Sequence, residues 1–177
     1  MAQGKLGGFQ TPRYRQAHDE GDQRRGKRQS SRQRKKAVTP LIMIRVVLDT
    51  NIVVSALLVP TGLEAFVLLL CVRGYIQACF SPALLAEYEL VLHRPRLKLP
   101  SFEVGQALTD IRSKGRLVHP TETISVSAHE ADNRIYECAA TAGADYIVTG
   151  NKKHFPHAYE GIEVVSAREL LERLRHA

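Results

Sequence analysis

Three polar residues with possible chemical roles follow a short apolar run in the stretch Val46-Val47-Leu48-Asp49-Thr50-Asn51. A run of β-branched and other apolar residues is typical of a strand buried on both faces of a parallel sheet. In open α/β sheets, ligands bind at the carboxyl ends of the strands, where these side-chain oxygens could reach a metal ion or a phosphate. The alternative for Asp49 is structural, because Asp and Asn are also favoured in turns and helix caps.

Two further carboxylates, Glu87 and Asp132, occur where such a fold would bring them near Asp49. The segment Thr149-Gly150-Asn151 adds a hydroxyl and an amide at the end of a later predicted strand. Mg²⁺ and Mn²⁺ prefer oxygen ligands, so these residue types fit a hard divalent ion. Taken singly, Glu87 could be a solvated helix residue and Asp132 could serve only the dipole of its helix. The coincidence of all these groups favours a metal site.

Helix and strand geometry excludes three nearby acids from the same site. Glu89 is two residues from Glu87, hence about 200° around a helix, and Glu137 is about 140° from Asp132. Asp145 begins the strand that ends near Thr149, which separates the two by about 13 Å.

The predicted strands and helices that carry these residues alternate along the chain. Ser81-Pro82 has the N-cap and first-turn residues of a helix, Gly143 follows another helix, and Ser166 precedes the last. The predicted helices cover 52–58, 63–73, 82–94, 101–114, 132–142 and 167–175, and the predicted strands cover 46–48, 75–80, 117–118, 145–149 and 162–165. This alternation indicates parallel βαβ units and an α/β fold with helices on both faces of the sheet.

The length of 177 residues and the apolar content of 44% suit one soluble domain, which we expect at residues 43–177. Residues 1–40 contain 11 Lys and Arg against 3 acids, and few large apolar side chains. We therefore expect residues 1–42 to be a disordered basic extension. It could bind nucleic-acid phosphates, or it could be an upstream segment that precedes the true start at Met43.

Membrane and cysteine signals are weak in this chain. No segment approaches the roughly 18 consecutive apolar residues of a membrane span, and no signal-peptide apolar region is visible, so we expect a cytoplasmic protein without membrane contact. Cys71, Cys79 and Cys138 lie in apolar surroundings without C-x-x-C spacing, which indicates buried thiols rather than a zinc site or disulfides.

Four blocks spread over about residues 43–175 resemble the PIN domain, the small nuclease fold of the virulence-associated protein C toxins. The similarity is greatest to the branch that contains toxin components of toxin–antitoxin pairs. The blocks are Val46 to Asn51, Leu85-Ala86-Glu87-Tyr88 with Leu92-His93-Arg94-Pro95-Arg96-Leu97, Asp132-Asn133-Arg134-Ile135-Tyr136-Glu137-Cys138-Ala139, and Ala144 through Phe155.

The resemblance implies a three-layer α/β/α sandwich around a five-stranded parallel sheet of order 3-2-1-4-5. It implies an endoribonuclease that uses Mg²⁺ or Mn²⁺ and leaves 5′-phosphate and 3′-hydroxyl ends on single-stranded RNA. Asp49, Glu87 and Asp132 correspond to the catalytic, metal-binding carboxylates, and Asn51 and Thr149 to supporting polar positions. An antitoxin protein and a homodimer are the partners expected from the family, with the apolar helix over 65–72 as an interface or, alternatively, a core helix.

One departure from the family is Asn151, where many PIN domains have a fourth Asp. An amide retains an oxygen ligand but removes a charge, so one ion is expected and a second is in doubt without substrate phosphate. Lys152 and Lys153 follow and could contact RNA phosphates, or they could belong to a solvated loop. The alternatives to a nuclease are an inactive PIN module that binds RNA or protein, and an aspartyl-phosphate phosphatase.

Overall fold

The computed structural model describes residues 43–155 and 158–176. The expected basic extension at residues 1–42 lies outside these described residues. Within them the strands are β1 (Arg45–Leu48), β2 (Gln77–Phe80), β3 (Arg116–Leu117), β4 (Tyr146–Val148), β5 (Ala158–Tyr159) and β6 (Ile162–Val165). The helices are α1 (Thr50–Leu58), α2 (Leu63–Val72), α3 (Pro82–Leu92), α4 (Ser101–Lys114), α5 (Glu130–Ala142) and α6 (Ala167–Leu174), with short 3-10 turns η1 (Pro95–Leu97) and η2 (Lys152–His154).

The strands form one sheet of order β3-β2-β1-β4-β6-β5. Its first five strands are mutually parallel, so the predicted order is confirmed, with β6 as the fifth parallel strand. The predicted number of strands is one too low, because β5 pairs antiparallel with β6. Glu160 (φ 49°) and Gly161 (φ 83°) make the two-residue turn between them, with the positive φ angles of a type I′ hairpin. Strand β5 has two residues, which is too short to show the alternation of apolar and polar side chains by which a strand is predicted.

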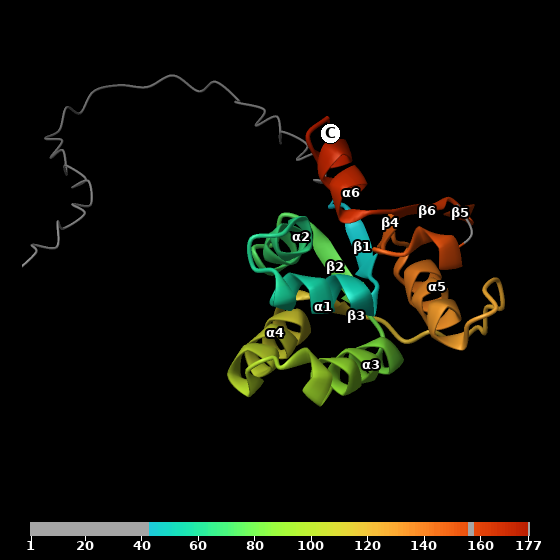
Figure 1. Ribbon diagram of the computed structural model, residues 1–177. Helices are drawn as coiled ribbons and strands as arrows, with labels where there is room; N and C mark the ends of the chain where they lie inside the picture. Colours follow the sequence, from blue (N-terminus) through green and yellow to red (C-terminus); the bar gives the residue numbers. More distant parts are fainter. Residues whose placement is uncertain (1–42, 156–157, 177) are drawn as a thin grey trace, which may run out of the picture. The chain divides into compact units, whose positions relative to one another are not determined.

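Helices cover both faces of the sheet, as the resemblance implies. Val46, Val47 and Leu48 of β1 are all buried, although successive side chains point to opposite faces. Helix α5 packs against β1, β2 and β4, while α6 packs against β4 and β6 and also contacts α2. Figure 1 shows α2 and α5 on opposite sides of β1. Helix α3 contacts α1, α4 and α5, so it links the layers next to the end of β1.

Local signals set most helix boundaries. The Ser81 hydroxyl accepts a hydrogen bond from Leu84 N at 3.2 Å, and Ser166 and Glu169 form a reciprocal capping box at the start of α6. Gly143 ends α5 with a left-handed φ of 59°. Helix α5 begins at Glu130, two residues before the predicted start. Its N-cap residue, His129, makes no side-chain capping hydrogen bond, so this start has no cap signal in the sequence.

Three free cysteines occur among the described residues, and Cys71, Cys79 and Cys138 are all buried, as predicted. Burial raises the pKa of Cys71 and of Cys138 to about 12, so both remain protonated near neutral pH.

In the part of the chain that the structure describes, no single helix has the length and apolar character needed to cross a membrane. Helices α1 and α2 meet those criteria only as a pair, and their axes are bent by 106° where they meet.

Candidate active site

Asp49 and Thr149 lie side by side at the carboxyl edge of the sheet. Strands β1 and β4 are neighbours, with Leu48 opposite Val148, so the residues that follow both strands must meet. The Asp49 amide donates to Val148 O at 2.9 Å. The Thr149 hydroxyl donates to Asp49 Oδ2 at 2.6 Å. Both side chains are buried, and Thr149 is completely inaccessible, so this pair is a rigid part of the site.

Asn51 joins the two strand ends through its amide. Its Nδ2 donates to Asp49 Oδ2 at 2.5 Å and approaches Thr149 Oγ1 at 3.3 Å, while its Oδ1 accepts from Gly150 N at 2.9 Å. A Cβ atom on Gly150 would lie 3.3 Å from Asn51 Oδ1, which is a tight contact. Asn51 therefore orients one carboxylate oxygen of Asp49 and fixes the loop that leads to Asn151.

Glu87 reaches the same edge from α3. Thr50, the first residue of α1, donates its hydroxyl to Glu87 Oε1 at 2.6 Å. The next residue on α3, Tyr88, is buried and donates its hydroxyl to the carbonyl oxygen of Leu48, the residue before Asp49. These two hydrogen bonds hold α3 against the end of β1. Neither donor is predicted from the sequence, because Tyr88 fits the apolar stripe of its helix and Thr50 fits a helix start.

Asp132 lies in the first turn of α5 and is fixed by the preceding loop. The Ser127 hydroxyl donates to Asp132 Oδ2 at 3.0 Å. The buried amide of Asn133 accepts from Val126 N at 3.1 Å and Ser127 N at 2.8 Å, and donates to Ser127 O at 3.0 Å. Asn133 was missed as a positioning residue. The feature that could have identified it is a polar residue on the face of α5 that is otherwise buried and apolar, the face that also carries Tyr136.

The surroundings of Asp49 change the pKa of its carboxyl. Burial raises the pKa of Asp49 most, hydrogen bonds from Thr149 and Asn51 oppose this, and the negative charges of Asp132 and Glu87 raise it further. The ion pairs within the described residues are Arg112–Glu89, Arg134–Glu130, Lys152–Glu169 and Arg173–Glu163, so none neutralises this cluster.

The chemistry of these donors fits a hard cation, but the carboxylates are not drawn together. Each one accepts from a different neutral hydroxyl, that of Thr149, Thr50 or Ser127. Nowhere in residues 43–155 and 158–176 are three Asp, Glu, His or Cys side chains grouped closely enough to hold a metal ion by themselves. A shared ion at Asp49, Glu87 and Asp132 thus stays a prediction.

The other predicted site residues differ in their surroundings. Asn151 and Lys153 are exposed after the end of β4. Lys152 instead pairs with Glu169 of α6, with Nζ 2.9 Å and 3.0 Å from its two carboxylate oxygens. Its charge is thus already partly balanced within the chain, whereas that of Lys153 faces solvent.

The three acids excluded by geometry have partners elsewhere. Glu89 pairs with Arg112 at 3.1 Å, Glu137 accepts from Ile124 N at 3.2 Å, and Asp145 accepts from Arg45 N at 2.8 Å.

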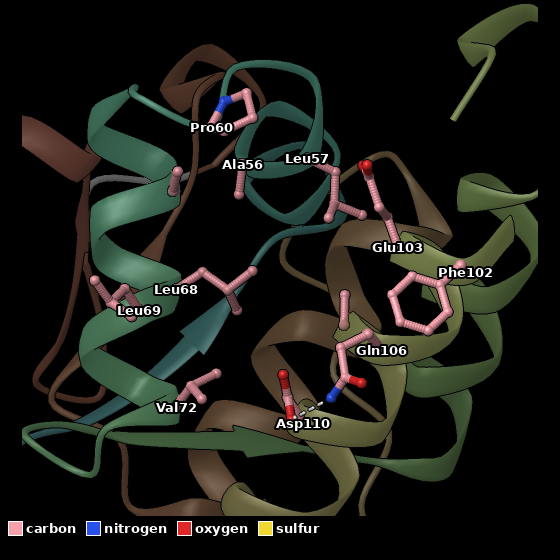
Figure 2. A pocket seen from close by; sticks show the side chains of 12 residues that line it. Ala56, Leu57, Pro60, Leu68, Leu69, Val72, Phe102, Glu103, Gln106 and Asp110 are labelled. Atoms are coloured by element: carbon pink, nitrogen blue, oxygen red, sulfur yellow. Dashed lines mark hydrogen bonds between the residues drawn. The ribbon is translucent and has the colours of Figure 1, made fainter. Parts of the chain in front are cut away.

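A separate, mainly apolar groove of about 530 Å³ lies between α1, α2 and α4, and no carboxylate of the cluster lines it. Figure 2 shows Leu68 and Val72 of α2 directed toward α4, with Phe102 on the α4 side of the groove. Helix α2 also contributes Val67 and Cys71 to the core. The sequence left two roles open for the segment 65–72, a core helix or an interface. Helix α2 has a buried face that fits the first role and an apolar face along the groove that fits the second.

Comparison with known proteins gives two similarities. The profile of a family described as "PIN domain" matches residues 45–153. An uncharacterized protein of Methanocaldococcus jannaschii, MJ1680, is 31% identical over 114 residues, which are 63% of this chain and 73% of that protein. The matched range includes β1, α3, the start of α5 and the end of β4, which are the elements that carry Asp49, Glu87, Asp132 and Thr149.

Proposed function

The chain belongs to the PIN domain family, which has a nuclease-type fold, and from this premise we propose that it is a metal-dependent endoribonuclease that cleaves single-stranded RNA. The observation that carries the proposal is the position of Asp49 at the end of β1, hydrogen-bonded to Thr149, with Glu87 held at the same strand end through Thr50. Burial raises the pKa of Asp49, and no ion pair among the described residues involves Asp49, Glu87 or Asp132, so a buried carboxylate here is costly unless a cation or a function requires it.

We assign Asp49, Glu87 and Asp132 to the catalytic group that holds Mg²⁺ or Mn²⁺. When bound, such an ion supplies an activated water and offsets charge on the phosphoryl oxygens. Thr149 and Asn51 orient Asp49, Thr50 orients Glu87, and Ser127 orients Asp132, through the hydrogen bonds described above. The backbone amide of Asn151 donates to Thr149 Oγ1 at 3.0 Å, and its neutral side chain, where many PIN domains have a fourth Asp, supports one ion rather than two.

The decisive experiment measures cleavage of labelled single-stranded RNA by the full chain. We expect cleavage that EDTA abolishes and Mn²⁺ restores. Asp49→Asn should reduce the rate by about 10²-fold or more, the typical loss for one electrostatic catalytic group. Asp145→Asn is the matched control, because it changes a carboxylate at the opposite end of the neighbouring strand, and it should retain activity. Full metal-dependent cleavage by Asp49→Asn would refute the assignment.

Metal binding can be measured apart from activity. A cation that binds the folded state stabilises it by mass action. Mn²⁺ should therefore raise the melting temperature of the wild-type protein and of Asp145→Asn, but not that of Asp49→Asn. An equal rise in all three proteins would place any bound ion elsewhere.

A second candidate is a non-catalytic PIN module that binds RNA or protein. Two observations favour it. Asn151 has an amide where many PIN domains have a carboxylate. The three carboxylates accept hydrogen bonds from three different hydroxyls, and no group of acids among the described residues is close enough to hold a metal ion. RNA binding without cleavage, in the presence of either metal, would support this module instead of the enzyme.

The biological role that we propose is the toxin component of a toxin–antitoxin pair. A toxin of this kind needs a protein partner, and the open apolar groove between α1, α2 and α4 supports such an interface, with the antitoxin or a second copy of the chain as occupant. Co-expression with the product of the neighbouring reading frame should suppress RNA cleavage. Unchanged cleavage by the co-purified pair would contradict the role without affecting the chemistry.

A further inference from the structure

The segment between α3 and α4 carries a group of cations that the proposed chemistry does not use. A cavity of about 200 Å³ is lined there by His93, Arg94, Lys98 and Ser101, with apolar residues at its base. We call it the α3–α4 basic cavity. It follows directly on the helix that carries Glu87, and no member of the carboxylate cluster lines it.

Two cations of this cavity are available to a ligand. Arg94 and Lys98 are exposed, and within the described part of the chain neither side chain takes part in an ion pair or a hydrogen bond. Glu89, an acid one turn earlier on α3, is already paired with Arg112. The positive charge of the cavity is thus not balanced by its own surroundings.

The remaining lining adds hydrogen-bond donors. Helix α4 starts at Ser101 after Pro100, which provides no side-chain cap for the first-turn amides. The Ser101 hydroxyl also lines the cavity, whereas His93 adds no donor, because its Nδ1 donates to Glu89 O at 2.7 Å and Nε2 of the neutral ring is then an acceptor. Cations with added neutral donors are the typical surroundings of a phosphate in proteins.

We propose that the α3–α4 basic cavity binds a backbone phosphate of the RNA strand, at a distance from the phosphate that the carboxylate cluster addresses. The proposal rests on the proposed ribonuclease function and adds a substrate-binding subsite to it. Glu87 and His93 are six residues apart, which separates them by about 9 Å along the axis of α3 and by about 120° around it. A strand that contacts both places must therefore pass around the end of α3. The cavity attracts the negatively charged backbone that the carboxylates alone would repel.

The test compares RNA affinity in two double variants of the full chain, both in the Asp49→Asn background so that RNA stays intact. Arg94→Gln/Lys98→Asn removes the cations of the cavity. Asn is chosen because Lys98 has a left-handed φ of 51°, which Asn adopts more readily than Ala. Arg73→Gln/Arg168→Gln is the matched control, since it removes the same charge from exposed positions at the end of α2 and the start of α6.

Fluorescence anisotropy with labelled single-stranded RNA, at several salt concentrations, gives the affinity and its salt dependence. The cavity variant should lose affinity by about tenfold, the size of one charge-assisted contact. The slope of log affinity against log salt should fall by about 0.7 for one lost phosphate contact on a single strand. The control should change both quantities much less.

Two results would overturn the subsite. Equal affinity losses in the two double variants would mean that net charge alone attracts RNA. An unchanged affinity in the cavity variant, while the wild-type protein cleaves RNA, would remove the subsite and leave the nuclease intact. If the wild-type protein neither binds nor cleaves RNA, the proposed function and the subsite both fail.

Discussion

Among single residues, Asp49 has a proposed role in catalysis but lowers the stability of the folded protein, because its carboxyl is buried. It caps α1, receives hydrogen bonds from Thr149 and Asn51, and is nevertheless a buried carboxylate near two like charges. Burial, together with the charges of Asp132 and Glu87, raises its pKa above the ordinary value of 3.8. A group whose pKa is raised on folding destabilises the folded state progressively as the pH rises above its ordinary value.

Replacing this carboxyl by an amide, in Asp49→Asn, should therefore raise the stability of the folded protein. The variant should melt at a higher temperature than the wild type at pH 7, in buffer without divalent metal, because the Asn side chain has no ionised form to bury. The advantage should shrink as the pH falls toward 3.8, because the wild-type carboxyl then becomes protonated. Thermal unfolding at pH 7 and pH 4 measures both values. An equal loss of stability at both pH values would show that the cap geometry, not the charge, dominates.

At the scale of elements, Tyr88 fixes α3 to the end of β1. Its buried hydroxyl donates to Leu48 O, and burial keeps its pKa well above the ordinary value, so the phenol remains a donor. Tyr88→Phe would leave that carbonyl without this donor, at a cost of about 1–3 kcal/mol in unfolding free energy. The same change should slow RNA cleavage, because Glu87 precedes Tyr88 on the helix.

The matched control is Tyr75→Phe, because the Tyr75 side chain is 74% exposed. Urea unfolding should show a stability close to the wild type for this control. If Tyr88→Phe were as stable and as active as Tyr75→Phe, the hydrogen bond to Leu48 would have no positioning role.

A second element-scale contact connects the turn after β4 with α6. Glu169 accepts from the Ser166 amide and from Lys152, and these contacts lower its pKa to about 2. A pKa lowered on folding contributes stability above the ordinary value of 4.5, and that contribution is lost as the pH falls toward 2. Glu169 is 38% exposed in its side chain, so the ion pair itself contributes little and the cap contributes most.

Glu169→Gln should therefore lower stability at pH 7 by about 0.5–2 kcal/mol, the usual range for a helix cap. The difference from the wild type should narrow between pH 4.5 and pH 2. Glu172→Gln, an exposed change on the same helix, is the control. A deficit that is independent of pH would exclude the ionised form of Glu169 as its cause.

At the scale of the whole molecule, the candidate site depends on contacts between distant parts of the chain. Thr149 bonds a carboxylate 100 residues earlier, and Thr50 bonds a carboxylate 37 residues later. The parallel order of β1 and β4 explains the first contact, and the position of α3 across the sheet edge explains the second. Perturbing either arrangement would separate the carboxylates without changing any of them.

The amino-acid sequence was enough to predict the alternation of helices and strands and the strand-end position of Asp49, and the resemblance added the parallel strand order. These features depend on short-range patterns: a β-branched run, Ser-Pro at a helix start, and Gly at a helix end. The helix over 101–114 and the strand over 162–165 have the predicted bounds for that reason.

The hydrogen bonds that hold the carboxylates, in contrast, could be found only in the folded protein. The hydroxyls of Thr50, Ser127 and Tyr88 have no distinguishing local pattern, since each also fits a helix start, a loop or a core. The two-residue strand β5 and the Lys152–Glu169 pair were hidden for the same reason. Such contacts join residues that come together only when the helices and the sheet pack, so the spacing of residues along the chain does not predict them.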